Sequence, residues 1–336
     1  MNNIGINGFG RIGRSILRII VESNSDLNVI AINDLGDKET LSYLFKHDSI
    51  MGILNMNVEL EDDSLIVGDR KIKLISHSDP AEIPWSDLGV DLVVESTGFF
   101  RDKDSLDKHI SSGAKKVVLT VPPKDEIDAT IVLGVNDNSL NPDDKLISNA
   151  SCTTNCLAPI AKVLNDNFKI KSGLMTTVHA YTADQPLADA AGVDLRRSRS
   201  AVENIIPNST RAPSIIEELM PEFQGKLDGI AFNVPVPNGS CVDLTTELRN
   251  VPTVDEANQA IKQFSNSSMK GIVGYTSDPI VSSDVIGREE TMVYDEKATM
   301  ITKESLLKTL CWYDNGWGFA SRILNVIDAY AVLEDN

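Results

Sequence analysis

Long apolar runs and basic residues are both scarce in this sequence of 336 residues. No apolar run approaches the roughly 18–20 residues that cross a membrane. Arg11, Arg14 and Arg18 interrupt the one stretch near the N-terminus that would otherwise resemble a signal peptide. The net charge is −18, from 31 Lys and Arg against 49 Asp and Glu, whereas nucleic acids and anionic membranes select basic surfaces. We therefore expect a cytoplasmic protein with neither a nucleic-acid nor a membrane partner.

Cysteine and histidine are also rare, with four residues of each. Cys152 and Cys156 stand four residues apart without a second pair, so their spacing indicates neither a zinc site nor a disulfide framework. Reduced thiols agree with a cytosolic location, and we expect no metal. The hydrophobic content of 42% is typical of a globular protein, and the length suggests two domains.

The N-terminal segment carries a glycine-rich motif between a predicted strand, 4–7, and a helix whose isoleucines recur with helical spacing. In that context the glycines permit a tight turn, close approach of a pyrophosphate, and packing of the helix on the strand. The helix N-terminus attracts the phosphates. Asp34 follows a second strand, 29–33, and suits hydrogen bonding to a ribose. The motif, G-x-G-x-x-G, comprises Gly8, Phe9, Gly10, Arg11, Ile12 and Gly13.

Further strands are predicted at residues 92–95, 117–120 and 131–133. Ser96-Thr97-Gly98 follows the first of them, and Thr120 ends the second. Because ligands of open α/β sheets bind at the carboxyl ends of strands, we expect these four residues to line a cofactor crevice. Ordinary turn chemistry at strand ends is the alternative. The first half is thus predicted to be a Rossmann-type, doubly wound α/β domain.

Cys152 stands where a predicted strand, 145–147, gives way to an amphipathic helix. Leu157, Ile160, Ala161 and Leu164 form the apolar stripe of that helix. The first turn of a helix offers unpaired N–H groups and a favourable dipole, which stabilise a thiolate. We therefore interpret Cys152 as a candidate nucleophile, with a small buried structural cysteine as the alternative.

A histidine and a cluster of arginines follow. His179 ends a predicted strand, 172–178, and a neutral imidazole there can take a proton from a thiol and return it to an oxyanion. Arg196, Arg197 and Arg199 lie in a long irregular stretch, 183–201. Guanidinium groups match phosphate and carboxylate, so the cluster indicates an anionic substrate. A structural histidine, and a solvated loop or subunit contact, are the alternatives.

Several stretches resemble phosphorylating glyceraldehyde-3-phosphate dehydrogenase, and they follow that family's order along essentially the whole chain. Residues 181–185 resemble this family more than its erythrose-4-phosphate relative. The resemblance implies an NAD-binding domain at 1–150, an α+β catalytic domain with a mixed or antiparallel sheet at 151–315, and a C-terminal helix, 316–336, that returns to the first domain. The stretches that carry it are 7–14, 148–156, 176–182, 194–197, 281–284 and 312–315, of which 148–156 is highly specific.

The family implies oxidation of D-glyceraldehyde 3-phosphate with NAD and inorganic phosphate, by a homotetramer. Cys152 would attack the aldehyde to form a thiohemiacetal, and His179 would act as base and orient the oxyanion. Asn315 would hold the carboxamide of the nicotinamide, and phosphate would cleave the thioester left after oxidation. The family's substrate-phosphate site maps onto Thr182 and Asp184. Its attacking-phosphate site maps onto Ser151, Thr153, Arg197 and Thr210.

Two departures concern the phosphate sites. The family usually has an arginine where this chain has Asn233, and a glycine where this chain has Arg211. One guanidinium is therefore lost and one gained along the same anion-binding surface. Our hypothesis is that Arg211 replaces the missing group, with altered substrate choice as the alternative.

Other departures concern the cofactor. Asp34 favours NAD, because a 2′-phosphate would face a carboxylate. Ala190-Ala191, however, resembles the forms of the enzyme that accept NADP. We expect NAD to be preferred, with NADP as a second cofactor that the sequence leaves open. Gly316 and Phe319 replace the usual Glu and Tyr after Asn315, which loosens the loop on the cofactor side.

Two rival functions stay open. One is a related dehydrogenase for another aldehyde phosphate, which Asn233 and Arg211 suggest. The other is a non-catalytic nucleotide-binding partner protein, against which Cys152, His179 and Asn315 argue.

Overall fold

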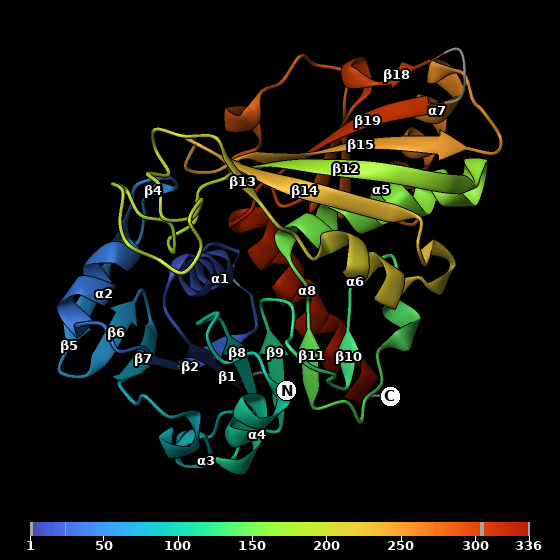
Figure 1. Cartoon of the computed structure of the whole chain (residues 1–336). Coiled ribbons are helices and arrows are strands. Elements are labelled where there is room, and N and C mark those ends of the chain that lie inside the picture. The colour runs from blue at the N-terminus through green and yellow to red at the C-terminus, as the bar shows by residue number, and fades with distance from the viewer. Residues whose placement is uncertain (1–2, 24, 303–305, 335–336) are drawn as a thin grey trace. The chain divides into compact units, whose positions relative to one another are not determined.

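The computed structural model describes residues 3–23, 25–302 and 306–334 (Figure 1). The chain divides into two compact units. The first unit comprises residues 1–131, 137–151 and 320–336, and the second comprises residues 132–136 and 152–319. A boundary between the units thus falls immediately before Cys152.

The first unit is built on a sheet that has nine strands among the described residues, in the order β10-β11-β9-β8-β1-β2-β7-β6-β5. The strands from β10 to β7 run parallel, and β6 and β5 extend the sheet antiparallel. The chain winds outward in both directions from between β1 and β8, so the carboxyl ends of these two strands form the switch point where such sheets bind ligands. The strand bounds are β1 (Asn3–Asn7), β2 (Asn28–Asn33), β5 (Val58–Glu61), β6 (Ser64–Val67), β7 (Arg70–Ile75), β8 (Leu92–Glu95), β9 (Lys116–Leu119), β10 (Ala129–Thr130) and β11 (Leu146–Ser148), with a separate hairpin of β3 (His47–Asp48) and β4 (Gly52–Ile53).

The central strands of this sheet are buried on both faces. All four residues of β8 and of β9 are buried, as expected for parallel strands with a cover on each side. Helix α1 follows the glycine-rich turn and buries Ile16, Leu17 and Ile20 completely. The helices of the first unit are α1 (Arg11–Glu22), α2 (Lys38–Lys46), α3 (Trp85–Leu88), α4 (Lys103–Ser111), two 3-10 turns (Pro80–Glu82 and Asp137–Ser139), and α8 (Trp317–Glu334) from Ala320 onward.

One predicted strand is wrong. The prediction placed it at residues 131–133, but β10 covers only Ala129–Thr130. The backbone N–H of Val132 donates to the side-chain oxygen of Asn136 at 2.8 Å, so a local turn takes the donor that a longer strand would offer. The strands predicted around β1, β2, β8, β9, β11 and β12 are confirmed. β8 has its predicted bounds, and one or both ends of each of the others are shifted by one or two residues.

The second unit is built on a mixed sheet that has eight strands in the described part of the chain, in the order β13-β14-β12-β15-β19-β17-β16, with β18 paired to β19. Parallel and antiparallel pairs both occur in it, so the predicted mixed sheet is confirmed. The strands are β12 (Ile170–Ala180), β13 (Ile206–Asn208), β14 (Leu227–Val234), β15 (Ser240–Leu248), β16 (Val273–Thr276), β17 (Met292–Asp295), β18 (Met300–Ile301) and β19 (Leu306–Tyr313). The helices are α5 (Cys152–Phe168), α6 (Ala212–Leu219), α7 (Val254–Asn266) and 3-10 turns at Pro221–Phe223, Ser282–Val285 and Glu296–Ala298.

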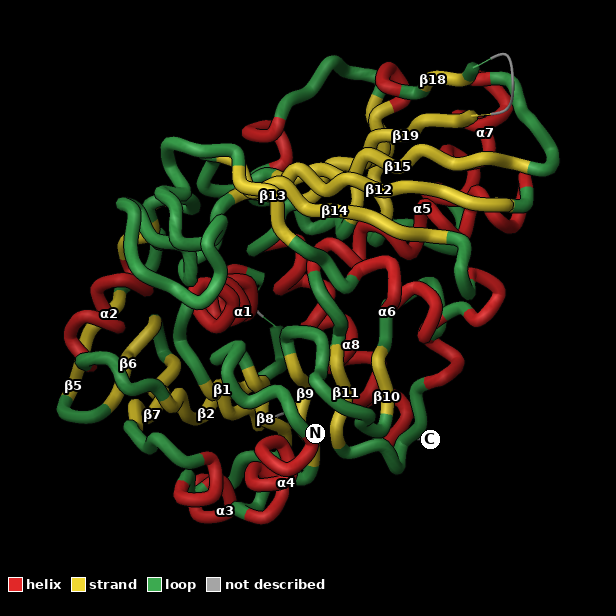
Figure 2. The backbone as a smooth tube through the Cα atoms, viewed as in Figure 1, coloured by secondary structure: helices red, strands yellow, loops and turns green. Residues whose placement is uncertain are grey.

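This second sheet has one covered and one open face. Buried and partly exposed residues alternate along β15 and β19, which is the pattern of a sheet packed on one side. Helix α5 contacts β12, β15 and β19 on the covered face, and α7 packs against α5 (Figures 1 and 2). The sequence 183–201 forms loops without strand or helix, as predicted.

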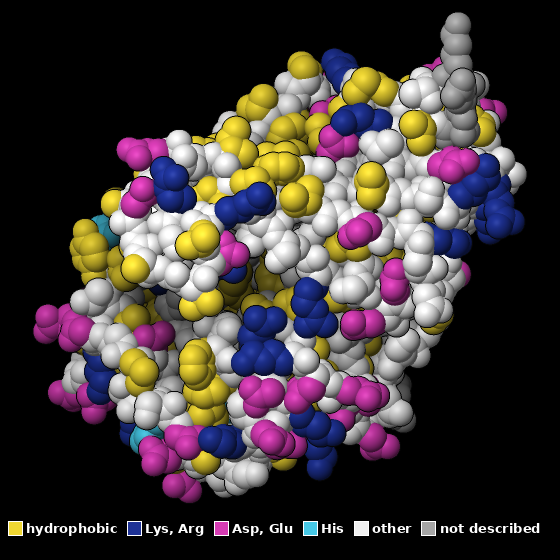
Figure 3. Space-filling model, viewed as in Figure 1, with side chains coloured by type: hydrophobic (Ala, Val, Ile, Leu, Met, Phe, Trp, Pro, Cys, Tyr) yellow, Lys and Arg dark blue, Asp and Glu magenta, His cyan; other side chains and the backbone are white. Residues whose placement is uncertain are grey.

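The surface carries charges of both signs. Figure 3 shows carboxylates interspersed with Lys and Arg side chains over the visible face, in keeping with the excess of acidic residues in the sequence. Among residues 3–23, 25–302 and 306–334, no helix combines the length and apolar character needed to cross a bilayer.

Candidate active site

A pocket of about 430 Å³ opens at the switch point of the first unit. It lies at the carboxyl ends of β1, β2, β7 and β8, the location at which open α/β sheets bind ligands. Its lining combines the glycine-rich turn with the polar residues that follow each strand. The lining residues are Asn7, Gly8, Gly10, Asn33, Asp34, Leu35, His77, Ser78, Ser96, Thr97, Phe99 and Phe100.

Two of the three glycines of the motif are required by their surroundings. Gly8 has a φ of +91°, and a Cβ there would stand 2.7 Å from the backbone nitrogen of Thr97. A Cβ on Gly13 would meet the carbonyl oxygen of Gly8 at 2.3 Å. Gly10, which caps α1, has no atom within 4 Å of such a Cβ and leaves that side of the helix N-terminus open to a ligand. These three positions fit the turn, helix packing and phosphate approach that the sequence predicts.

Asp34 lies in the same pocket, with its carboxylate held by the backbone. Its oxygens accept the N–H of Phe9 at 2.7 Å and the N–H of Gly36 at 2.8 Å. A carboxylate has about four acceptor sites, so Asp34 keeps capacity for ribose hydroxyls. The fixed negative charge also disfavours a second phosphate at that position.

Only some of the remaining residues predicted for the cofactor site line this pocket. Ser96 and Thr97 line the pocket, while Gly98 has a φ of +69° and turns the chain after them. Thr120 is buried and donates its N–H to the carbonyl of Glu95 at 3.0 Å. Phe9 is buried, and Arg11 and Ile12 begin α1 with partial exposure.

Sequence reasoning missed part of the lining. Asn33 ends β2, and His77 and Ser78 follow β7, a strand that the sequence analysis did not identify. The alternating apolar pattern of β7 was the available signal. Phe99 and Phe100, which form an edge-to-face pair 5.2 Å apart, add an aromatic wall.

In the second unit, Cys152 and His179 come together as predicted. Cys152 is the first residue of α5, and His179 lies one residue from the end of β12. Their Sγ and Nε2 atoms are 3.5 Å apart. The opposite ring nitrogen, Nδ1, lies 2.6 Å from the carbonyl oxygen of Ala180. A carbonyl only accepts, so Nδ1 carries a proton, and a neutral His179 presents an unprotonated Nε2 to the thiol.

The thiol itself is held protonated near neutral pH. Burial of the sulfur raises the pKa of Cys152 to about 11, although the residue as a whole keeps partial exposure. Hydrogen bonds from Thr153 oppose this shift without overcoming it. Desolvation of the sulfur thus outweighs the hydrogen bonds at the start of α5, so the thiolate predicted at the helix N-terminus is not favoured in this structure. Attack by Cys152 requires a base, and the Nε2 of His179 is positioned to be that base.

A buried tyrosine links the helix of Cys152 to the strand of His179. The hydroxyl of Tyr313 lies 2.9 Å from the hydroxyl of Thr153 and 2.9 Å from that of Thr177. The Tyr313 ring also meets the imidazole of His179 edge-on, with centroids 6.0 Å apart. These contacts fix α5 against β12 and hold the two reactive side chains at their separation.

The turn that leads into α5 contains an unusual backbone conformation. Ala150 has a φ of +56°, in the left-handed region that residues with a Cβ rarely adopt. The Ser148 hydroxyl accepts the N–H of Ala150 at 3.0 Å and donates to the carbonyl of Val121 at 2.9 Å. Ser151, predicted at the attacking-phosphate site, follows this turn and is partly exposed. Such local strain is common beside catalytic residues.

Three residues predicted to bind phosphate form one cluster. The hydroxyl of Thr182 donates to the carboxylate of Asp184, and the guanidinium of Arg197 pairs with the same carboxylate. Arg196 is exposed, and Arg199 pairs with Asp189 at 3.0 Å. Asp184 therefore links the residues that the family resemblance assigns to the substrate-phosphate and attacking-phosphate sides.

Asn233, Arg211 and Thr210 occupy three different surroundings. Asn233 is buried opposite His179 in the strand register, donates to the carbonyl of Ala180 at 3.4 Å, and accepts from Asn208 at 3.3 Å. Arg211 caps α6, is exposed, and pairs with Glu218 at 3.7 Å. Thr210 lines a pocket on the open face of the sheet.

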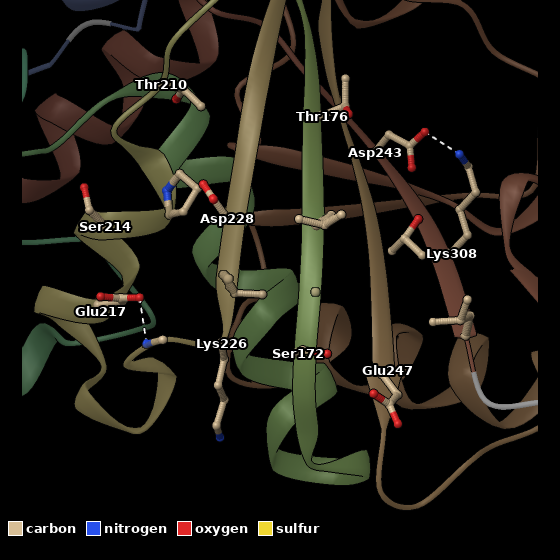
Figure 4. A pocket seen from close by; sticks show the side chains of 17 residues that line it. Ser172, Thr176, Thr210, Ser214, Glu217, Lys226, Asp228, Asp243, Glu247 and Lys308 are labelled. Carbon is tan, nitrogen blue, oxygen red and sulfur yellow. Dashed lines mark hydrogen bonds and ion pairs between the residues drawn. The ribbon is translucent and has the colours of Figure 1, made fainter.

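That second pocket has a volume of about 970 Å³ and spans β14, β12, β15 and β19 (Figure 4). Leu174 and Leu306 contribute apolar surface that is 68% and 45% exposed. Both charges are present along this face in Figure 4. Lys308 pairs with Asp243, and Glu247 pairs with Lys171 at 2.9 Å. No group of nucleophile and base resembling Cys152 and His179 is among its lining residues.

Asn315 is a buried side chain with its amide held in one orientation. Its Oδ1 accepts a hydrogen bond from the hydroxyl of Ser240 at 3.0 Å. The N–H₂ group at the other end of the amide therefore points away from Ser240. The preceding Asp314 accepts the N–H groups of Gly316 and Trp317, each at 2.7 Å, at the start of α8. The predicted loosening at Gly316 is not evident here, because these bonds secure the segment and Phe319 is buried.

Comparison with known proteins covers both units. Residues 2–103 match the family model described as glyceraldehyde 3-phosphate dehydrogenase, NAD binding domain, and residues 151–315 match the C-terminal domain of the same family. A glyceraldehyde-3-phosphate dehydrogenase of Streptomyces coelicolor is 50% identical over 325 residues, 96% of each chain. One of Borreliella burgdorferi is 49% identical over 330 residues, 96% of this chain and 98% of the relative. Glyceraldehyde-3-phosphate dehydrogenase 1 of Bacillus cereus is 46% identical over 327 residues, 97% of each chain.

Proposed function

The chain belongs to the glyceraldehyde-3-phosphate dehydrogenase family, and from this premise we propose that it oxidises D-glyceraldehyde 3-phosphate with NAD and inorganic phosphate to 1,3-bisphosphoglycerate. The observation that carries the proposal is the pairing of Cys152 Sγ with His179 Nε2 at 3.5 Å in the second unit. The first unit supplies the dinucleotide pocket with Asp34 at its edge.

His179 and Cys152 divide the covalent chemistry between them. His179 takes the thiol proton at Nε2 as Cys152 attacks the aldehyde carbon, and the imidazolium then hydrogen-bonds the oxyanion of the thiohemiacetal. Loss of a hydride leaves a thioester on Cys152. Phosphate attacks the thioester carbon, the C–S bond breaks, and the acyl phosphate leaves while Cys152 regains its proton. The oxidation energy stays in the thioester and is not lost to water.

NAD supplies the hydride acceptor for this oxidation. The pocket in the first unit fits such a cofactor because Gly10 leaves space at the N-terminus of α1 and Asp34 keeps acceptor capacity for a ribose. Asn315 would hold the nicotinamide carboxamide with the amide end that Ser240 leaves available. We propose that NAD is preferred over NADP because of the Asp34 charge, with Ala190-Ala191 as the feature that permits some use of NADP.

The two anions bind, in our proposal, around the Thr182–Asp184–Arg197 cluster and the start of α5, where Ser151 and Thr153 lie. Asn233 is neutral and held by Asn208, so the charge that the family usually places there must come from elsewhere. Arg211 is the candidate that the sequence offers. Its pair with Glu218 is long and both side chains are about half exposed, so exchanging that pair for a phosphate costs little free energy.

A second function, oxidation of another aldehyde phosphate, is favoured by the same observation on Asn233. A neutral amide at this position changes the charge that meets the substrate, and such a change can alter substrate choice. A steady-state comparison of glyceraldehyde 3-phosphate with erythrose 4-phosphate distinguishes the two. A larger kcat/KM for the four-carbon substrate would favour the second function.

We also propose a homotetramer that acts in the cytoplasm. The open face of the second sheet exposes leucines and carries both signs of charge, and a surface of mixed charge can pair with a copy of itself about a two-fold axis. The four cysteines are free thiols, which agrees with a reducing compartment. The division into residues 1–150, 151–315 and 316–336 remains our proposed functional division. It is supported by the assignment of residues 320–336 to the first unit.

The proposed function is tested by following NADH absorbance with glyceraldehyde 3-phosphate in the presence and absence of phosphate. We expect a phosphate-dependent rise that is lost in Cys152→Ser. A Cys156→Ser variant is the matched control, because Cys156 lies one helical turn on, is buried, and contacts the Cys311 carbonyl. Absence of turnover with any aldehyde phosphate would favour the non-catalytic nucleotide-binding protein.

A further inference from the structure

A buried carboxylate underlies the dinucleotide pocket of the first unit. Glu95, the last residue of β8, is 0% exposed. One of its oxygens accepts the backbone N–H of Thr97 at 2.8 Å and the hydroxyl of the same residue. Its other oxygen accepts the side-chain amide of Asn7 and lies 3.0 Å from Nε2 of His109. An isolated carboxylate is costly to bury, so this set of partners indicates a built arrangement.

Trp85 fixes the role of His109 in this network. The indole N–H of Trp85, which can only donate, points to Nδ1 of His109 at 3.0 Å. Nδ1 therefore accepts, and the proton of the neutral imidazole is on Nε2, where it is donated to Glu95. His109 and Glu95 are both fully buried.

Backbone groups fix the orientation of Asn7 in the same way. The N–H of His77 donates to Oδ1 of Asn33 at 2.8 Å, so the amide end of Asn33 faces Asn7. That amide donates to Oδ1 of Asn7 at 2.8 Å. The amide end of Asn7 is thereby directed to Glu95. Each of these partners is thus a hydrogen-bond donor to the Glu95 side chain.

We infer that Glu95 is a positioning residue of the dinucleotide site, acting through Asn7 and Thr97. Both of these residues line the pocket, whereas Glu95 lies beneath them. The backbone N–H of Thr97 donates a hydrogen bond to Glu95. The nitrogen of this group is also the atom nearest to the Cβ position of Gly8. Glu95 thus fixes the position of the backbone at Thr97, against which the glycine-rich turn packs at Gly8. This inference depends on the dinucleotide binding proposed above and assigns to it a residue outside the pocket.

The test is Glu95→Gln in the full chain, with the dissociation constant of NAD measured by calorimetry alongside KM and kcat. The N–H₂ group of a glutamine at position 95 would face other donors. His109 cannot turn an acceptor towards it because Trp85 donates to the Nδ1 of His109. Asn7 cannot do so because Asn33 donates to the Oδ1 of Asn7. We expect the dissociation constant and the KM for NAD to rise roughly ten-fold or more, with kcat at saturating NAD changed less than about three-fold.

Two further comparisons separate positioning from general stability. Asp295→Asn removes a buried carboxylate from the second unit, where it accepts the indole N–H of Trp312 at 3.2 Å, and should lower the melting temperature without changing NAD affinity. At position 109, His109→Gln keeps a donor for Glu95 and should stay near wild-type NAD affinity, whereas His109→Leu should weaken it.

An unchanged NAD dissociation constant in a folded Glu95→Gln protein would overturn the inference, even if its melting temperature fell. If that variant does not fold, equal NAD affinity of His109→Gln and His109→Leu would overturn it instead. A wild-type protein that fails to bind NAD would refute the proposed function itself, which is a different result.

Discussion

The strongest prediction concerns the proton that Cys152 must lose. In the wild type, His179 Nε2 lies 3.5 Å from the sulfur, and we propose that it accepts that proton. In His179→Asn, no base remains at that position, and reaction depends on spontaneous ionisation of a thiol whose pKa burial raises to about 11. At about pH 7.5 only about one thiol in three thousand would then be ionised. We expect activity to fall by about 10²–10⁴-fold, within the usual range for loss of a general base.

The pH dependence gives this prediction a distinctive form. The rate of His179→Asn should rise about ten-fold per pH unit from neutral pH towards the thiol pKa, because thiolate is the reacting species. Alkylation of Cys152 by iodoacetamide, followed by mass spectrometry, measures the same ionisation without substrate or cofactor. The wild type should show a much flatter profile on the alkaline side.

His47→Asn is the matched control, because it makes the same substitution at a histidine that stacks on Tyr43 at 4.6 Å in the first unit. It should retain the wild-type rate and pH profile. A loss of less than ten-fold in His179→Asn, or alkylation rates that do not change with pH, would refute the assignment of His179 as the base.

Four further predictions follow from other parts of the structure. Arg211→Gly should raise the KM for the aldehyde phosphate or for phosphate about ten- to a hundred-fold, because one charge-assisted contact to a phosphate is lost. Unchanged Michaelis constants in steady-state kinetics would reject the proposal that Arg211 replaces the arginine missing at position 233. Asp34→Ser should raise kcat/KM with NADP relative to NAD by about ten-fold or more, since it removes a carboxylate that repels a 2′-phosphate. Lys116→Met should lower the free energy of unfolding by about 2–4 kcal/mol in urea titrations, because it removes a buried cation that stacks 4.0 Å from the Tyr330 ring centre and donates to backbone carbonyls. Burial raises the pKa of Cys241 from 9.0 to about 12, so the protonated thiol favours the folded state below pH 9, and that contribution is lost as the pH rises to about 12. The free energy of unfolding should therefore fall with pH in this range. Cys241→Ser should reduce the slope of that fall by about 1.4 kcal/mol per pH unit.

The parts of the fold that the sequence predicted are those determined by local pattern. The strand, glycine turn and helix at the N-terminus are contiguous. Gly8 and Gly13 are required by neighbours in the segment after β8 and within the same motif, respectively. The strand at 131–133 was misplaced for the opposite reason. Its apolar composition suits a strand, but the Asn136 side chain takes the N–H of Val132 and ends the pairing earlier.

Residues contributed by unrecognised elements were beyond local reasoning. His77 enters the pocket because β7, which the sequence analysis did not identify, lies beside β2, with Lys73 opposite Ala31 in the strand register. The network around Glu95 depends on three orientations, of Trp85, His109 and Asn7, that only packing can set. No periodicity in the sequence distinguishes Glu95 from an ordinary residue at the end of a strand.

By itself, the sequence determined the dinucleotide motif and the family, because these depend on residue type and order. It also supplied Cys152 and His179 as the proposed nucleophile and base. Only the tertiary structure decided how Cys152 is activated. Burial holds the thiol protonated, and the Ala180 carbonyl fixes the tautomer that lets His179 accept its proton. Both effects arise from the packing of α5 against β12, since desolvation and hydrogen-bond direction depend on positions in space.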